Sequence, residues 1–221
     1  MNVLGLIEEY EIPLLAIGSA PPPAPRWNQD WFPRLDAAAA YAMVRSLRPR
    51  RIVEVGCGHS TRFLARAVAD GGLDTRITAI DPKPRASLAG LGIEWIAGPV
   101  QRVAAFPPLG EGDILFIDSS HQLKPGSDVE FLLKAVLPML PAGVRVHFHD
   151  IFLPDDYPPA WAWRRYNEQA AVASLIERDI FKVDFASHAL VSRSPERISG
   201  VLARLPLVAG AIESSLWLTK N

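Results

Sequence analysis

The sequence predicts a doubly wound α/β fold, in which helices cover both faces of a mainly parallel sheet. From residue 49 onward, short apolar runs alternate with helical segments, as expected of strands that are buried on both faces. Several of these runs end in acids, histidines or glycines, at the sheet edge where such folds bind ligands. We expect this domain to span residues 36–221, with residues 1–35 forming an N-terminal extension or cap.

The composition limits the class of protein. The chain has 221 residues, 49% of them hydrophobic, and a formal net charge of −1. These values exclude a largely disordered chain and give no global field that would recruit nucleic acid or an anionic membrane. Cys57, the only cysteine, leaves no internal disulfide, and neither a signal peptide nor an apolar span of ~20 residues is recognisable. We expect a cytoplasmic protein without a nucleic-acid or membrane partner.

The order of the elements is predicted from helix and strand propensities and from the prolines, glycines and capping residues that end or begin them. Residues 1–20 are expected to form a helix and a strand or arm, and the prolines of 21–25 a stiff connector. The alanine-rich run 36–47 favours a helix that Pro49 ends. Strands are predicted over 52–55, 76–80, 93–97, 113–117, 144–148, 181–185 and 215–219. Helices are predicted over 60–69, from Ser127 to about residue 137, near 164–178 and over 196–204.

A glycine loop follows the first predicted strand and reads Glu54-Val-Gly-Cys-Gly58. Gly56 and Gly58 permit a tight turn and a close approach of a ligand to the backbone. The Glu54 carboxylate would repel a pyrophosphate, whereas S-adenosylmethionine carries a sulfonium and an ammonium that tolerate an acid. Ser60, just beyond the loop, either caps the next helix or bonds a cofactor carboxylate.

Asp81 ends the second predicted strand, at the position of an acid that binds both ribose hydroxyls. The alternative for Asp81 is a turn-initiating Asp-Pro pair. Together with the glycine loop, Asp81 predicts an adenosine site.

A second group of polar residues follows the fourth and fifth strands. Asp118 and His121 come after the fourth strand, and His149 and Asp150 come after the fifth. Because the ends of parallel strands meet at one edge, we expect these side chains to lie near the glycine loop. They are either a functional cluster or polar residues at a solvated edge. His147 is expected to pack inside, since it stands earlier in its strand.

These segments resemble class I S-adenosylmethionine-dependent methyltransferases. Glu54–Gly58 resembles their first motif, Ile80-Asp81 their ribose-binding acid, and Asp113–Asp118 their fourth motif. Residues 117–121, 125–128 and 146–154 resemble a bacterial subgroup, methyltransferase family 24. The resemblance spans about residues 36–190 and implies a Rossmann-like sheet of seven strands. The strand over 215–219 would then be the last one, and antiparallel.

The resemblance implies methyl transfer to a small molecule, with oxygen as the favoured acceptor atom. Methyl transfer is a direct displacement that needs alignment and a deprotonated acceptor. Asp118, His149 and Asp150 either hold a divalent ion, or His149 or His121 acts as a general base beside a carboxylate such as Asp118. A further alternative is that neither device operates. His149 as a ligand disfavours magnesium and favours Mn, Fe or Zn. Asp118 is also expected to contact the cofactor.

Two other classes of protein remain open. An NAD-dependent oxidoreductase is disfavoured by Glu54 and by Thr61 at the place of a third glycine. A catalytically silent nucleotide-binding or regulatory protein would keep the pocket without turnover.

The aromatic segment 152–163 is expected to be a lid or substrate wall, or a loop packed on the body. We expect a second group of aromatic residues either to cover the ligand-binding edge of the sheet or to form a homodimer contact. This group consists of Trp27, Trp31 and Phe32.

Overall fold

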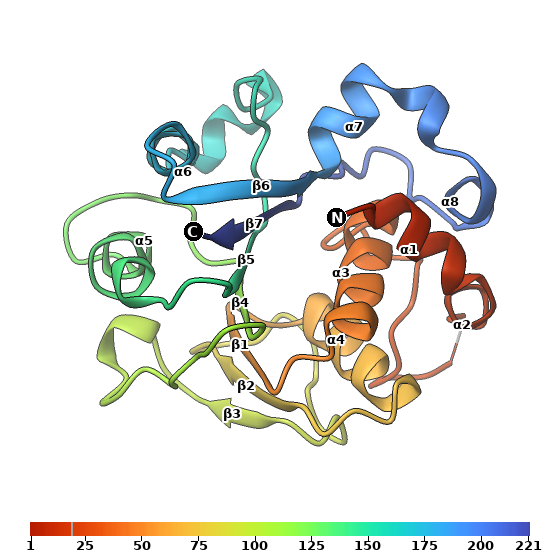
Figure 1. Ribbon diagram of the computed structural model, residues 1–221, viewed down its shortest axis with the longest axis horizontal. Helices are drawn as coiled ribbons and strands as arrows, with labels where there is room; N and C mark the ends of the chain where they lie inside the picture. The colour runs from red at the N-terminus through yellow and green to blue at the C-terminus, as the bar shows by residue number, and fades with distance from the viewer. Residues whose placement is uncertain (19) are drawn as a thin grey trace.

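The computed structural model describes residues 1–18 and 20–221, and its centre is one seven-stranded sheet with the order β3-β2-β1-β4-β5-β7-β6 (Figure 1). The strands are β1 Arg51–Val55, β2 Arg76–Ile80, β3 Glu94–Ile96, β4 Ile114–Ile117, β5 Arg145–Phe148, β6 Phe181–Ala186 and β7 Leu216–Lys220. β1 to β5 are parallel, and β7 lies antiparallel between β5 and β6. The predicted mainly parallel sheet with an antiparallel last strand is confirmed.

Helices cover both faces of this sheet, as predicted (Figure 1). The α-helices are α1 Val3–Glu9, α2 Glu11–Leu15, α3 Arg34–Leu47, α4 His59–Asp70, α5 Asp128–Phe131, α6 Gln169–Glu177, α7 Ser187–Arg193 and α8 Gly200–Arg204. α1, α3 and α4 lie on one face, and α5 and α6 lie on the other. None of the helices among the described residues combines the length and apolar character needed to cross a bilayer.

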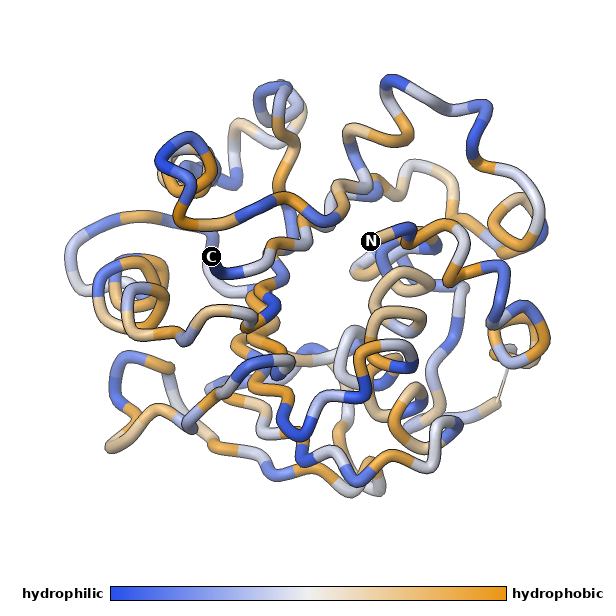
Figure 2. The backbone as a smooth tube through the Cα atoms, viewed as in Figure 1, coloured by the Kyte–Doolittle hydropathy of each residue, from blue (hydrophilic) through white to orange (hydrophobic). Residues whose placement is uncertain are grey.

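The alternation of side chains along the strands produces two hydrophobic cores. Ile114 and Phe116 of β4 point into the core beneath α3 and α4, whereas Leu115 and Ile117 point into the core beneath α5 and α6. This is the period of two that a strand imposes. The hydrophobic colouring concentrates along the central strands (Figure 2), so burial on both faces explains why these runs are continuously apolar.

The N-terminal residues differ from the predicted helix and strand, because they form two helices, α1 and α2. The Asn2 side chain caps α1 by accepting from the Gly5 N–H at 3.2 Å. Val3, Ile7 and Leu14 are buried in the same core as α3. Residue 19, at the end of the predicted segment, lies outside the described residues. The division of the chain at residue 35 stays a prediction.

Two other helices differ from expectation for local reasons. The helix predicted from Ser127 ends at Phe131 and continues as a π turn over Leu132–Val136, before a 3-10 turn that contains Pro138. Proline lacks the N–H that an α-helix would use there. The helix predicted near 164–178 begins only at Gln169, because Arg165 adopts a left-handed conformation with φ 56°.

The C-terminal helices also differ. The segment predicted as helical over 196–204 is divided into a 3-10 turn, Pro195–Arg197, and the short helix α8, and Gly200 at their junction has φ 54°. α7 was not predicted from the sequence.

The register of the strands aligns their carboxyl ends. Val55 of β1 pairs with Ile80 of β2 and with Ile117 of β4, which in turn pairs with Phe148 of β5. The residues that follow these four positions therefore emerge side by side at one edge of the sheet. Those residues are Gly56, Asp81, Asp118 and His149.

Candidate active site

The glycine loop after β1 is pressed against the end of β4. A Cβ atom on Gly56 would lie 1.8 Å from the carbonyl oxygen of Asp118, and Gly56 has φ +78°. Both the space and the backbone conformation therefore require glycine. The Gly56 N–H donates to Ile80 O at 3.0 Å, and the Asp118 N–H donates to Val55 O at 2.8 Å. These bonds fix the loop between its two neighbouring strands.

Glu54 is fully buried beneath this loop. Its Oε1 accepts a hydrogen bond from Ser60 Oγ at 2.6 Å, while its Oε2 has no partner among the described residues. Burial raises the pKa of Glu54 to about 8, although the hydrogen bond from Ser60 opposes the shift. Ser60 makes no helix-capping bond, so that alternative is not what the structure shows. An unpaired buried carboxyl oxygen suits a cationic ligand.

Asp81 joins the glycine loop to the end of β2. Its Oδ2 accepts from the Cys57 N–H at 2.8 Å, and its Oδ1 accepts from the Lys83 N–H at 2.6 Å. The second bond closes an Asx-type turn, as the turn alternative predicted. Cys57 is buried, in agreement with a packing role.

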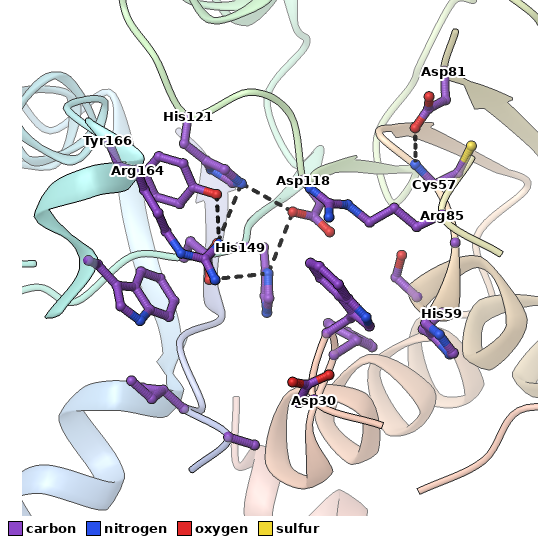
Figure 3. Close-up of a pocket in the computed structure, with 18 of the residues that line it drawn as sticks. Asp30, Cys57, His59, Asp81, Arg85, Asp118, His121, His149, Arg164 and Tyr166 are labelled. Carbon is purple, nitrogen blue, oxygen red and sulfur yellow. Dashed lines mark hydrogen bonds and ion pairs between the residues drawn. The ribbon is translucent and has the colours of Figure 1, made fainter. Parts of the chain in front are cut away.

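Asp118, His121 and His149 converge at the ends of β4 and β5 (Figure 3), and the Asp150 carboxylate lies beside both imidazoles. His121 Nε2 lies 3.2 Å from Asp118 Oδ1 and 3.6 Å from Asp150 Oδ2. His149 Nδ1 lies 3.5 Å from Asp118 Oδ1 and 3.5 Å from Asp150 Oδ1. His121 and Asp150 have positive φ angles of 57° and 55°. The structure thus brings together the residues that the sequence placed after these strands.

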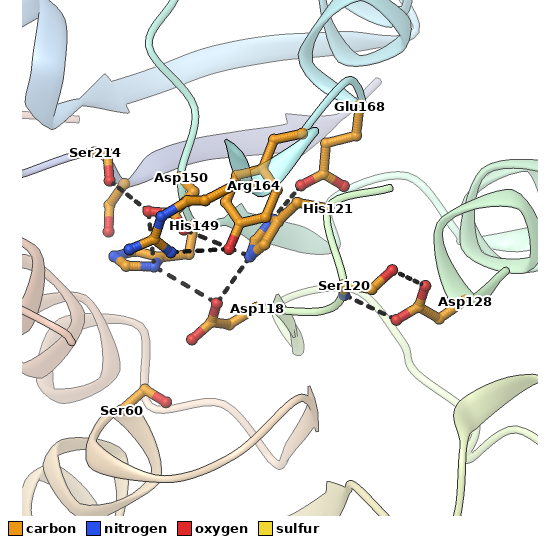
Figure 4. A network of polar contacts seen from close by, with 12 residues as sticks. Ser60, Asp118, Ser120, His121, Asp128, His149, Asp150, Arg164, Glu168 and Ser214 are labelled. Carbon is orange, nitrogen blue, oxygen red and sulfur yellow. Dashed lines mark hydrogen bonds and ion pairs between the residues drawn. The ribbon is translucent and has the colours of Figure 1, made fainter. Parts of the chain in front are cut away.

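The outer nitrogen of each imidazole faces another carboxylate. His121 Nδ1 lies 2.5 Å from Glu168 Oε1, and His149 Nε2 lies 3.3 Å from Asp36 Oδ2. Figure 4 shows Glu168 on the far side of His121, away from Asp118. A carboxylate on the outer nitrogen fixes the ring and leaves the inner nitrogen toward Asp118 and Asp150.

Asp36 is also bonded to the residues that precede β7. Its Oδ2 accepts from the Ser214 N–H at 2.9 Å and its Oδ1 accepts from the Ser215 N–H at 3.0 Å. Ser214 Oγ donates to Asp150 Oδ1 at 3.1 Å. Sequence reasoning missed Asp36, Glu168 and Ser214 as site residues. Asp36 and His149 are 113 positions apart, and no local motif signals such a contact.

The charges of this cluster depend on one another. Burial alone would lower the pKa of both imidazoles, but Glu168, Asp118 and Asp150 outweigh it and raise the pKa of His121 and His149 well above 6.5. Burial would raise the pKa of Asp118, yet His149 and His121 hold it below its ordinary value. A proton or another cation must therefore lie between each inner imidazole nitrogen and the carboxylates of Asp118 and Asp150, since two lone pairs in contact would repel each other.

The same atoms could hold a metal ion. Asp118, His149 and Asp150 each offer one ligand atom, and these atoms lie within 4.8 Å of one another. His121 Nε2 approaches the same carboxylates. A mixed set of carboxylate oxygens and imidazole nitrogens fits a first-row divalent ion better than magnesium. The donor set therefore fits the predicted divalent ion, and the nitrogen ligand that His149 offers fits the predicted preference for Mn, Fe or Zn over magnesium.

Two hollows meet at Asp118. A central pocket is lined by the cluster and by aromatic and basic side chains, among them Trp31, Arg85, Trp161, Arg164 and Tyr166. A second hollow, the edge groove, lies between the ends of β2, β3 and β4 and is lined by residues 80–85, 99–101 and 118–120. Asp81, Arg85 and Asp118 line both hollows.

Two other histidines near this edge of the sheet differ in position. His59 lines the central pocket, whereas His147 is buried, stacks on Phe116 at 3.7 Å and contacts Ser215 Oγ at 2.8 Å. Packing inside was expected for His147.

The aromatic residues are divided in the same way. Trp31, Phe32 and Trp161 line the central pocket. Trp27, Phe32 and Phe152 are buried in the body, so Trp27 and Phe32 are not free for a dimer contact. The segment 152–163 thus combines both expected roles, as pocket wall and as packed loop.

Comparison with known proteins identifies the class. Residues 53–151 match the model of methyltransferase family 24, described as a methyltransferase domain. The SAH-bound Podospora anserina methyltransferase PaMTH1 is 18% identical over 100% of this chain and 88% of that chain, with a TM-score of 0.55. The SAM complex of TomG, an O-methyltransferase from Streptomyces achromogenes, is 18% identical over 100% and 89%, with a TM-score of 0.51. No curated protein matches the sequence.

An O-methyltransferase from Bacillus cereus, in complex with SAH, shares the fold with a TM-score of 0.52, at 14% identity over 100% of this chain and 91% of that chain. Fold and matched domain agree in class: the protein is an S-adenosylmethionine-dependent methyltransferase of class I. Its residues 53–151 match the model of methyltransferase family 24, the subgroup that the sequence resembles.

Proposed function

We propose that the protein transfers a methyl group from S-adenosylmethionine to a hydroxyl of a small molecule. The observation that carries this proposal is the position of Asp118, at the junction of the edge groove and the central pocket. A cofactor with its adenosine in the edge groove would extend past Asp118 into the central pocket. The acceptor would then enter from the opposite side, between the aromatic walls.

In this proposal the cofactor is held by residues that the sequence suggested, together with Arg85. Asp81 binds the ribose hydroxyls, and Gly56 and Gly58 allow the close approach of the methionine part. Glu54 supplies a buried carboxyl beneath the ammonium. Arg85, whose guanidinium lies 4.2 Å from the Trp31 ring and has no ion pair among the described residues, supplies positive charge for the cofactor carboxylate.

The cluster after β4 and β5 prepares the acceptor. Asp118, His149 and Asp150 would hold a divalent ion, which lowers the pKa of an acceptor hydroxyl when bound. Without an ion, His149 Nδ1 or His121 Nε2 would take the proton of the hydroxyl once that imidazole had lost its own proton. Asp36 and Glu168 orient these rings in both versions. The convergence of imidazole nitrogens on carboxylates supports the version with an ion.

Three findings support oxygen and a small acceptor. The cluster suits removal of a proton from a weakly acidic group. The pocket is bounded by aromatic rings rather than by an open surface. TomG and the Bacillus cereus protein, which share the fold, carry the name O-methyltransferase. A cytoplasmic location, the absence of nucleic-acid and membrane partners, and a homodimer stay predictions from the sequence.

The test begins with calorimetry of S-adenosylhomocysteine binding to the full chain. A methyl-transfer screen of hydroxylated metabolites follows, with and without divalent ions. We expect binding, turnover that a chelator abolishes, and near one ion per chain by metal analysis. Activity that is unchanged in chelator, without bound metal, would leave the general-base version. Binding of NADH without binding of S-adenosylhomocysteine would overturn the proposed function.

Variants separate chemistry from a silent regulatory role. Asp118→Asn and His149→Ala should lower kcat by about 100-fold or more, because general acid–base catalysis alone contributes about that much. Asp74→Asn, an exposed acid before β2 at the opposite edge of the sheet, is the matched control and should keep full activity. If no acceptor is turned over and the site variants preserve every cellular phenotype, the protein is a regulator rather than an enzyme.

A further inference from the structure

We propose that Arg164 binds a carboxylate of the methyl acceptor, so that the acceptor is a planar, hydroxylated carboxylic acid. The inference rests on the proposed function, because it concerns the acceptor of the same reaction. It adds a specificity-determining residue and a class of substrate.

Arg164 is a cation whose donors are largely unused. It is the last residue of the 3-10 turn Pro159–Arg164 and lines the central pocket. Its Nη1 donates to Tyr166 Oη at 3.0 Å, whereas its Nε is buried and has no partner in the described part of the chain. Within residues 1–18 and 20–221, Arg164 forms no ion pair, although its pocket is lined by several acids. A half-buried guanidinium with unused donors is suited to an anionic ligand.

Aromatic rings hold the guanidinium in place. Its Cζ lies 4.2 Å from the ring of Trp161, 5.1 Å from that of Trp163 and 5.5 Å from that of Tyr166. The backbone is fixed as well, since Gln122 Nε2 donates to Arg164 O at 3.0 Å. Cation–π contacts of this kind restrict the side chain but leave its N–H groups free for an oxyanion.

The position of Arg164 assigns it to the acceptor rather than to the cofactor. Arg85 lines both the edge groove and the central pocket, whereas Arg164 lines the central pocket alone. Tyr166, which accepts from Arg164, packs on the His121 ring with their centroids 4.5 Å apart. The guanidinium is therefore one aromatic side chain away from the cluster that prepares the acceptor hydroxyl (Figure 3).

The remaining charges favour a carboxylate over a phosphate. Asp30, Asp81, Asp118 and Asp150 line the same pocket as Arg85 and Arg164. Acids therefore outnumber arginines among the lining residues, and they would repel a dianion more strongly than a monoanion. One guanidinium pairs with one carboxylate through two parallel hydrogen bonds. The rings of Trp31 and Trp161 in the wall favour a flat acceptor, because aromatic faces stack on planar groups.

The experiment compares acids with their own esters. Methyl transfer by the full chain would be measured for hydroxybenzoates and dihydroxybenzoates, and for their methyl esters, as release of S-adenosylhomocysteine. We expect the acids to exceed the esters at least ~10-fold in kcat/KM, the scale of a charge-assisted hydrogen bond. Arg164→Gln should lower kcat/KM for the acids by ~10- to 100-fold, mainly through KM, and leave the esters unchanged.

Two controls show whether Arg164 only supports the fold. Arg165→Gln changes the adjacent, exposed arginine and should alter neither acids nor esters. Arg164→Lys keeps the charge and should restore part of the preference for acids. A merely structural role would lower turnover of acids and esters alike, and that result would overturn the proposal.

The outcomes also separate this proposal from the proposed function. If the chain binds S-adenosylhomocysteine but turns over no compound of the panel, binding of 3,4-dihydroxybenzoate and its methyl ester would be measured by calorimetry in the presence of S-adenosylhomocysteine. Tighter binding of the acid, lost in Arg164→Gln, supports the proposal. Equal binding, or none, overturns it and leaves the proposed function intact. Failure to bind S-adenosylhomocysteine overturns the proposed function itself.

Discussion

Gly56 allows the glycine loop and the end of β4 to touch, and this contact can be tested directly. Gly56→Ala should destabilise the fold by ~4 kcal/mol or more, since its Cβ would lie 1.8 Å from a backbone oxygen that cannot move freely. Urea unfolding measures this loss. Gly72→Ala is the matched control, because Gly72 also has a positive φ, +52°, but nothing within 4 Å of its Cβ position. The control should lose only ~1–2 kcal/mol, from backbone strain; equal losses would contradict the close-contact explanation.

Glu54 makes stability depend on pH. Its pKa is raised to about 8 by burial, whereas an unfolded glutamate titrates near 4.3. The folded state therefore keeps the proton longer, and Glu54 costs stability progressively as pH rises from its unfolded to its folded pKa. Relative to Glu54→Gln, which does not titrate, the wild type should lose ~3–5 kcal/mol over this window. Urea unfolding of both proteins at several pH values measures the difference, and a difference independent of pH would disprove the shift.

At the scale of elements, Asp36 connects the start of α3 to the residues before β7. Its two oxygens accept from the Ser214 and Ser215 N–H groups in the buried interior. Asp36→Ala would leave both donors unsatisfied and should cost ~2–5 kcal/mol, whereas Asp36→Asn keeps one acceptor and should cost about half as much. Thermal unfolding distinguishes the two variants. Equal losses would mean that these bonds do not join the elements as described.

The sequence predicted elements well where a local apolar run determined them, and poorly where packing against residues distant in the sequence determined them. The strands β1, β2, β4 and β5 are continuous apolar runs, so their positions were evident within one residue or so. The residues that follow them, such as Asp118 and His149, were predicted as a group because parallel strands end at one edge.

Asp36, Glu168 and Ser214 could not be predicted as part of the site. Glu168 meets His121 across 47 positions, and Ser214 meets Asp36 across 178. Contacts at such separations depend on the completed topology rather than on local spacing. The left-handed conformation of Arg165, which delays α6, has no local signal either, since the residue is not glycine or asparagine.

At the scale of the whole molecule, cofactor binding should stabilise the fold. S-adenosylhomocysteine at 100 times its Kd should add ~2.7 kcal/mol, because it binds the folded state alone. Asp81→Ala should remove most of this ligand-dependent increase, whereas Asp74→Asn should keep it. Differential scanning calorimetry with and without ligand measures the increase. An unchanged increase in Asp81→Ala would mean that the cofactor does not use this carboxylate.

The place of β7 has a consequence for how the chain is made. β7 pairs with β5 and β6 on its two sides, yet it is synthesised after both. Until the ribosome has released residues 214–220, the hydrogen-bonding edge of β5 has no strand beside it, and neither Asp36 nor Asp150 has its serine partner. An open edge of this kind pairs readily with other chains. Premature termination before Ser214 should therefore yield aggregates. Because residues 214–220 complete both the sheet and the site, the two are completed at the same stage of translation.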